Sequence, residues 1–374
     1  MNTITTRGSG LLTGSALEQT AQWLTSHQQP NGEILWARDG KSDPWDHVHA
    51  AMGLAVAGRL DPARAAFRFM TSTQEEDGGW PCERVWGAPT RVTRETNHAA
   101  YIATGLWHLH QAHPDVDFLA EMWPTVERAI DWVVSLQLPS GAIAWASKRG
   151  KVWRAPLITG SSSIHGSLVC ALHIAERLSM ERPTWRRAQQ RLMRALKYNP
   201  DVFADTDLPE KPGRHAMDWY YPVLAGALRD ADGRKRLLSA PDAKDFVGEG
   251  LGCACVRDQP WYTVAETCEL VLALDSVGLT DRARQVLSWT ESQRDADGGY
   301  WTGTTHPDRV RFPEGEKTTW TAATVLLAHD AVAGFSRTSR FFHQLSWLSL
   351  EDRQEPRERP AARHYGEASS SPAE

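Results

Sequence analysis

Two stretches of the sequence decide the fold, because they repeat one pattern. Gln29-Pro30-Asn31-Gly32-Glu33-Ile34-Leu35-Trp36 aligns with Gln137-Leu138-Pro139-Ser140-Gly141-Ala142-Ile143-Ala144-Trp145. Shorter versions of the pattern occur at residues 74–80 and 293–301. In each, a helix-like segment ends in Gln, a polar turn with Gly follows, and Trp comes next. Because glycine suits both a helix C-terminus and a tight turn, the pattern predicts helices joined by repeated turns.

A second recurring element follows these turns. It is an apolar segment of three to four helical turns, rich in small residues, that begins with a polar or acidic residue, as helix N-termini do. A helix that is apolar on all faces is a buried helix. We therefore expect six inner helices, near residues 46–58, 97–110, 162–175, 218–228, 265–278 and 318–334.

Between the inner helices lie amphipathic segments of a different kind. The clearest has apolar residues every four positions from Phe118 to Val134, which is typical of a helix with one buried face. Six such outer helices are expected, near residues 16–28, 62–73, 117–136, 184–196, 233–239 and 281–292. Alternating outer and inner helices predict an all-α protein, an (α/α)6 toroid of six helical hairpins. No run of strands is predicted.

This architecture allows one large domain, which we place at residues 15–350 and which includes a further helix-like segment at 340–350. Residues 1–14 are expected to form a flexible N-terminus. Residues 351–374 are rich in Pro, Arg, Glu and Ser, a composition typical of a disordered tail.

Composition excludes several classes of protein. The 374 residues carry 41 Lys+Arg and 46 Asp+Glu, and no basic block indicates a nucleic-acid partner. No apolar stretch approaches the ~20 residues of a membrane span, and the polar N-terminus does not resemble a secretory signal. Five scattered cysteines do not form a disulfide framework, so a cytoplasmic location is predicted. Seventeen Trp residues indicate repeated structural Trp positions or a cleft with stacking surfaces.

The Gln…Gly…Trp turns resemble the QW-type repeats of terpenoid cyclases and protein prenyltransferases, which share the α/α toroid. The same architecture, with Asn/Asp-Gly-Trp turns, is similar to that of six-hairpin glycosidases, including glucoamylase-like and unsaturated glucuronyl hydrolase-like enzymes. The resemblance covers about residues 15–335. These motifs identify the fold better than the chemistry.

The chemical motifs of the isoprenoid enzymes are absent from the sequence. Terpene cyclases of the resembling class carry a DxDD acid motif, and 43–46 and 205–207 are the nearest stretches, neither of which fits. Prenyltransferases bind zinc through Asp-x-Cys and a distant His, and no Asp-x-Cys occurs. Cys253, Cys255 and Cys268 do not have a usual zinc spacing. We expect neither a metal nor another cofactor.

In a toroid, the N-terminal ends of the inner helices converge at one rim, and the sequence places acidic, polar and aromatic residues there. Helix capping alone accounts for most of them taken singly, including Asp46, Asn97, Ser162, Asp218 and Thr318. Glu95 and Glu316 also suit the positive end of a helix dipole. Glu266 is harder to explain, because an acid in a small-residue inner helix is costly unless it is paired or exposed. Asp218 is flanked by aromatic residues.

A rim lined by acids and tryptophans suits a small-molecule carbohydrate substrate, since two carboxyl groups can perform acid/base hydrolysis of a glycoside. The catalytic candidates are Asp46, Asp218, Glu266 and Glu316, with no pair preferred. The candidates for substrate binding are Trp45, Glu95, Asn97, His98, His165, Trp219, Tyr220, Trp261 and Trp320. The sequence therefore predicts a glycoside hydrolase. An isoprenoid cyclase or prenyltransferase and a non-catalytic ligand-binding toroid are the alternatives.

Overall fold

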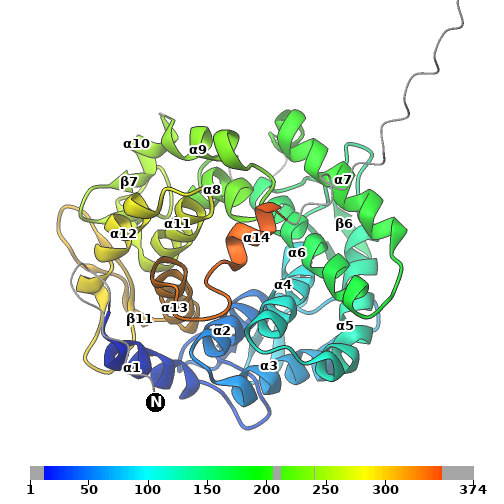
Figure 1. Ribbon diagram of the computed structural model, residues 1–374, viewed down its shortest axis with the longest axis horizontal. Coiled ribbons are helices and arrows are strands. Elements are labelled where there is room, and N and C mark those ends of the chain that lie inside the picture. Colours follow the sequence, from blue (N-terminus) through cyan, green and yellow to red (C-terminus); the bar gives the residue numbers. More distant parts are fainter. Residues whose placement is uncertain (1–11, 205–211, 240, 348–374) are drawn as a thin grey trace, which may run out of the picture.

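A computed structural model describes residues 12–204, 212–239 and 241–347, and its helices form a double ring (Figure 1). Each inner helix contacts the next one, and α13 contacts α2, which closes the inner ring. The inner helices are α2 (Pro44–Val56), α4 (Thr96–Ala112), α6 (Ile158–Arg177), α8 (Ala216–Leu224), α11 (Val264–Ser276) and α13 (Thr319–Ala333). The outer helices are α1 (Gly14–Thr25), α3 (Leu60–Thr73), α5 (Val116–Ser135), α7 (Pro183–Tyr198), α9 (Asp230–Leu238) and α12 (Thr280–Ser288).

The toroid predicted from the sequence is confirmed. The inner helices are buried nearly all round: every residue of α2 and of α11 is buried. The outer helices bury one face, as in α5, where Phe118, Met122, Val126 and Ile130 are buried. Five of the six inner helices begin one to four residues earlier than expected, α6 by four, and α13 begins one residue later.

The repeated Gln turns are joints between neighbouring outer helices. Gln74 Nε2 donates to the carbonyl of Gly78 in its own turn and to that of Thr125 in α5, both at 2.9 Å. Gln137 does the same with Gly141 and with Ala188 of α7. The first turn corrects the alignment by one residue. Gln28, not Gln29, makes these bonds, donating to Gly32 and to Pro62 of α3.

The fourth turn closes the outer ring. Here Arg294 occupies the position of the glutamine, pairing with Tyr300 as Gln137 pairs with Ile143. Its guanidinium bonds the side chain of Gln19 in α1 at 2.6 Å. Thr20, also in α1, donates to the carbonyl of Gly298 at 2.8 Å. The last repeat is therefore joined to the first helix.

The sequence predicts no run of strands, and the strands of the structure are short. Three small antiparallel sheets lie at the rim where the inner helices begin, because β1, β4, β9 and β11 each lead directly into an inner helix. Such short strands of two to seven residues carry too little alternation to be seen in the sequence. The sheets are β1 (Lys41–Ser42), β2 (Glu83–Val85) and β3 (Ala88–Arg91); β4 (Arg94–Glu95), β5 (Ala146–Lys148) and β6 (Lys151–Trp153); and β7 (Val247–Gly248), β8 (Gly252–Ala254), β9 (Trp261–Thr263), β10 (Trp301–Thr305) and β11 (Arg311–Lys317).

The opposite end of the ring is covered by α14 (Phe341–Trp347), which lies across its middle in Figure 1. Phe341 packs edge-on against His108 with ring centroids 4.9 Å apart. His343 Nε2 lies 2.6 Å from a carboxylate oxygen of Asp275 in α11. The expected N-terminal flexible segment, apart from residues 12–14, and the expected tail lie outside the described residues. Within the described ranges, no helix has the length and apolar character needed to cross a membrane.

Candidate active site

Most of the polar residues expected to cap the inner helices do something else. Asp43 caps α2, accepting from the backbone N–H of Asp46 at 2.9 Å, and Thr318 caps α13. The cap positions of α4, α6 and α8 are Glu95, Leu157 and His215, and none of them makes a side-chain cap bond. The capping interpretation is therefore correct for Thr318 and wrong for Asp46, Asn97, Ser162 and Asp218.

Asp43 and Asp46 form a carboxyl pair at the start of α2. Asp46 is buried, with 7% of its surface exposed, on a helix that faces the ring interior. Burial raises the pKa of Asp46 well above its usual range, and the charge of Asp43 and a hydrogen bond with it raise the pKa further. A carboxyl that retains its proton near neutral pH can act as a general acid.

Glu266 lies in the first turn of α11, the same level of the ring as Asp46 in α2. Only 6% of its surface is exposed. Burial raises the pKa of the Cys255 thiol, and the charge of Glu266 and a hydrogen bond between the two groups add to that effect. Glu266 is thus a buried carboxyl that interacts with a thiol, which is a weak hydrogen-bond donor.

Glu269 lies one turn deeper in α11 and is a residue that the sequence analysis missed. It is fully buried, and the hydroxyls of Tyr220 and Tyr221 donate to its two oxygens at 2.6 and 2.8 Å. Burial raises the pKa of Glu269 to about 8, against the opposing effect of these two hydrogen bonds. The Glu266–Glu269 spacing places both acids on one helix face, a signal that was available in the sequence.

An aromatic cluster lies between the two acidic groups. The rings of Trp45 and Tyr101 stack with centroids 4.0 Å apart, and Tyr221 lies 5.9 Å from Trp45. The hydroxyl of Tyr101 lies 3.1 Å from His49 Nδ1. Asp46 and Glu269 are close enough that the charge of Glu269 contributes to the raised pKa of Asp46. The acids of α2 and α11 therefore belong to one site.

Helix α4 contributes polar atoms that have no hydrogen-bond partner among the residues that the structure describes. The Oδ1 of Asn97 and the Nδ1 of His98 are buried without a hydrogen bond. The other ring nitrogen of His98 lies 3.6 Å from Glu95, which also accepts from the indole N–H of Trp145 at 3.3 Å. Because buried polar atoms are rarely left unpaired, Asn97 and His98 are suited to bind substrate hydroxyls.

Asp218, in the first turn of α8, is held by two donors. It accepts from the hydroxyl of Thr159 at 2.6 Å and from the backbone N–H of Gly213 at 2.9 Å. Glu316 in β11 accepts from Thr302 in β10 at 3.0 Å. Both carboxylates lie at the rim, but their bonds tie neighbouring segments together.

Two of the predicted binding residues lie away from this site. His165 is fully buried, with its ring nitrogens bonded to Ala225 and to Gln189 of α7. Trp219 donates its indole N–H to the carbonyl of Arg236 in α9 and stacks on Phe246. Both side chains point toward the outer helices, so packing against α7 and α9 explains them. A sequence pattern gives the helix but not the face from which such a side chain projects.

The remaining predicted residues stay at the rim. Tyr220 is bonded to Glu269, and Trp320, in the first turn of α13, lies near enough to Glu269 to affect its pKa. Trp261 stacks on Phe312 with ring centroids 4.3 Å apart, so one of its faces is covered.

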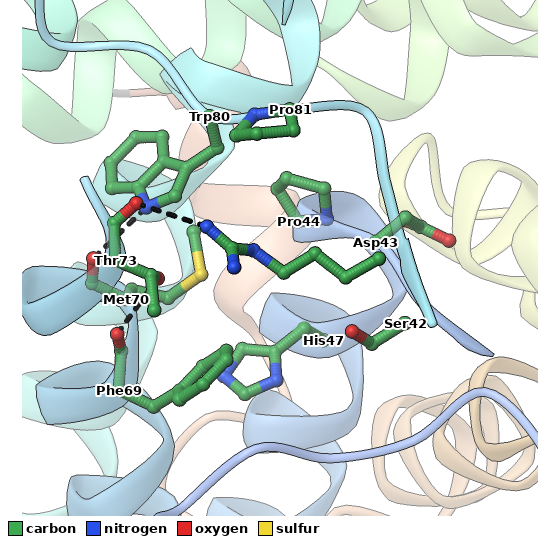
Figure 2. A pocket seen from close by; sticks show the side chains of 10 residues that line it. Ser42, Asp43, Pro44, His47, Phe69, Met70, Thr73, Trp80 and Pro81 are labelled. Carbon is green, nitrogen blue, oxygen red and sulfur yellow. Dashed lines mark hydrogen bonds between the residues drawn. The ribbon is translucent and has the colours of Figure 1, made fainter. Parts of the chain in front are cut away.

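A small pocket lies behind the start of α2, between this helix and α3 (Figure 2). Trp80, Met70 and Phe69 line one side of it, and the Trp80 indole N–H donates to the carbonyl of Met70 at 2.9 Å. The carboxylate of Asp43 points away from these residues in Figure 2. The carboxylate of Asp43 therefore does not point into this pocket.

Comparison with known proteins agrees with this chemistry. The MMP endo-(1,4)-3-O-methyl-alpha-D-mannosidase of Mycolicibacterium hassiacum is 44% identical over 324 residues, which is 87% of this chain and 88% of that protein. The chain belongs to the same family, and it is a glycoside hydrolase. Residues 41–145 also match the mannosylglycerate hydrolase MGH1-like glycoside hydrolase domain.

Solved structures support the fold of this glycoside hydrolase. A glycosidase variant in complex with glucose has a TM-score of 0.64 at 15% identity, covering 86% of this chain and 96% of that one. The GH63 mannosylglycerate hydrolase of Thermus thermophilus, also with glucose, has a TM-score of 0.62 at 12% identity, covering 83% and 99%. The prediction of a carbohydrate-active enzyme is confirmed, and the isoprenoid alternative is not supported.

Proposed function

We propose that this glycoside hydrolase cleaves α-mannosidic bonds inside chains of 3-O-methylmannose. The support for this substrate is the 44% identity to an enzyme named for that activity, spread over 87% of the chain. The rim chemistry suits it, because neutral sugars bind through hydroxyl partners such as Asn97 and His98.

We assign the role of general acid to Asp46. Its raised pKa keeps the proton on the carboxyl until the glycosidic oxygen takes it, and Asp43 maintains that state with its negative charge. Glu266 then acts as the base that activates water. Glu269, one helical turn deeper, holds the side chains of Tyr220 and Tyr221 in place by accepting their hydroxyl hydrogen bonds. The observation that carries this assignment is the raised pKa of Asp46 beside Asp43, in the ring of helices that also holds Glu266.

The test is hydrolysis of an α-(1→4)-linked 3-O-methylmannose oligosaccharide, with an α-(1→4)-glucan of equal length as the comparison. Asp46→Asn and Glu266→Gln are each expected to lower kcat by about 10²–10⁴-fold, the usual contribution of general acid–base catalysis. Glu121→Gln is the matched control, because Glu121 pairs with Arg68 on the surface of the outer ring.

Asp218→Asn tests the alternative that Asp218 is the general acid. A kcat lowered by about 10²–10⁴-fold in Asp218→Asn, together with an active Asp46→Asn, would assign the acid to Asp218. Preference for the glucan over the methylated mannoside would contradict the proposed substrate but not the assignment of the two carboxyls.

A further inference from the structure

One tryptophan at the rim is not packed into the protein. Trp86 lies at the tip of the β2–β3 hairpin and exposes 66% of its surface, and it is the one exposed tryptophan among those whose exposure the structure describes. The others at the rim are covered: Lys41 Nζ sits 3.0 Å above the ring of Trp36, and Phe312 stacks on Trp261. A large apolar ring left in solvent calls for an explanation.

The turn that carries Trp86 does not favour this residue. Trp86 and Gly87 have φ values of 51° and 78°, the left-handed pair of a two-residue hairpin turn for which Asn-Gly is the preferred sequence. The β5–β6 hairpin makes the same turn with Arg149 and Gly150, at 50° and 80°. The turn therefore does not require an aromatic side chain. A residue that its local backbone disfavours is a candidate for a functional role.

The indole of Trp86 packs against the backbone of Gly40. A Cβ atom placed on Gly40 would lie 2.2 Å from Cε2 of the indole, so the ring rests directly on the Gly40 backbone. The backbone N–H of Trp86 also donates to the carbonyl of Gly40 at 2.8 Å. Arg84 braces the turn by donating to the carbonyl of Gly87 at 2.9 Å. The ring is thus fixed on one side while most of its surface stays open to solvent.

The Gly40 backbone under the indole is continuous with the carboxyl pair of Asp43 and Asp46. Gly40 is followed by β1 and then by Asp43, and β1 pairs with β2 in the sheet that carries Trp86. Gly40 and Asp43 are three residues apart, at most roughly 10 Å of extended chain, so the backbone on which the indole rests lies close to the carboxyl pair.

We propose that Trp86 forms a distal subsite, where its indole stacks on a sugar unit of the same chain that the enzyme cleaves. The proposal rests on the proposed function, because an enzyme acting inside a chain must accommodate sugars on both sides of the bond. An indole face binds the C–H surface of a neutral sugar, and a 3-O-methyl group adds further apolar area to that contact.

The experiment compares an α-(1→4)-linked 3-O-methylmannose disaccharide with a longer oligosaccharide of the same linkage. Trp86→Asn removes the indole but supplies the residue that the turn prefers, so its thermal midpoint should equal or exceed that of the native protein. We expect its ratio of kcat/KM for the long substrate to that for the short one to fall about tenfold, the loss of one stacking contact. Trp86→Phe should restore part of this ratio. Met180→Ala, an exposed apolar residue in the short α6–α7 connection, is the control.

A ratio unchanged in Trp86→Asn would overturn the subsite. If the native enzyme hydrolyses neither methylmannoside, the proposed substrate fails, and the subsite is then tested by calorimetric titration of the long oligosaccharide. Weaker binding by Trp86→Asn than by the native protein would support the subsite in that case, and equal binding would overturn it.

Discussion

The backbone N–H of Asp46 donates to the carboxylate of Asp43 at 2.9 Å, so the residue that caps α2 also holds a negative charge beside the proposed acid. Capping and pKa control are therefore performed by one side chain. A cap must stay in place for the helix to begin, and this constraint also fixes the position of the charge that acts on Asp46.

Replacing this charge should change the pH dependence of catalysis. Asp43→Asn keeps a side-chain oxygen that can cap α2 but removes the charge that raises the pKa of Asp46. Since the acid works in its protonated form, the alkaline limb of the kcat profile should move to lower pH. Asp39→Asn is the control, because the exposed Asp39 caps the turn before β1, bonding the N–H of Lys41. An unmoved limb in Asp43→Asn would contradict the role of Asp43.

Glu269 should make stability fall as pH rises. Its pKa is about 8 in the folded protein and near 4.5 when unfolded, so between these values the unfolded chain binds fewer protons. Within this window, each rise of one pH unit lowers the free energy of unfolding by up to about 1.4 kcal/mol. Glu269→Gln removes this dependence, and its thermal midpoint relative to the native protein should rise from pH 5 to pH 8. A difference that does not vary with pH would show that Glu269 is charged in the fold.

His108 should make stability fall as pH drops, which is the opposite of the effect of Glu269. Burial lowers its pKa to about 3, with a smaller effect of the neighbouring His49, so below about pH 6.5 the unfolded state binds the extra proton and stability falls as pH drops. His108→Gln should weaken the pH dependence of the unfolding free energy by about one proton between pH 4 and 6. His113→Gln, at an exposed histidine, is the control. Equal slopes for the two variants would contradict the buried neutral state of His108.

The ring could be predicted from the sequence because the patterns that define its helices and turns are local and recur along the chain. Apolar all-round helices and Gln-Gly turns recur, and each turn is bonded to the next outer helix in the same way, as Gln74 is to Thr125. The three rim sheets could not be predicted, since strands such as β1 and β4 have two residues each and are defined by partners distant in the chain.

The site could be predicted only in part. Asp46 and Glu266, the proposed acid and base, are among the predicted residues because each lies in the first turn of an inner helix. The direction of a side chain depends on packing that one chain does not reveal, which is why His165 and Trp219 were included and Glu269 was missed. In the sequence, Glu269 is an acid inside an apolar helix, where burial is energetically costly. In the structure, Tyr220 and Tyr221 donate hydrogen bonds to its carboxyl group.

The Gln turns should contribute measurably to stability. Gln28→Ala removes two hydrogen bonds that link the first turn to α3, and we expect a loss of about 1–3 kcal/mol in the free energy of unfolding. Gln29→Ala is the matched control, since the backbone N–H of Gln29, which the variant keeps, bonds the carbonyl of Glu33. Denaturant titration of both variants measures the difference. An equal loss in the two would mean that the one-residue correction of the alignment is wrong.

The contact between the Trp86 indole and Gly40 can be tested by a double-mutant cycle. Gly40 has a φ of +86°, and a Cβ there would overlap the indole, so Gly40→Ala combines backbone strain with a steric clash. Gly58→Ala, at a φ of +74° with open space around it, carries the strain alone, and strain of this kind costs more than about 1 kcal/mol. We expect Gly40→Ala to be the more destabilising of the two in the native background and to equal Gly58→Ala in Trp86→Asn, because the clash is then gone. A coupling near zero between positions 40 and 86 would show that the indole does not rest on Gly40.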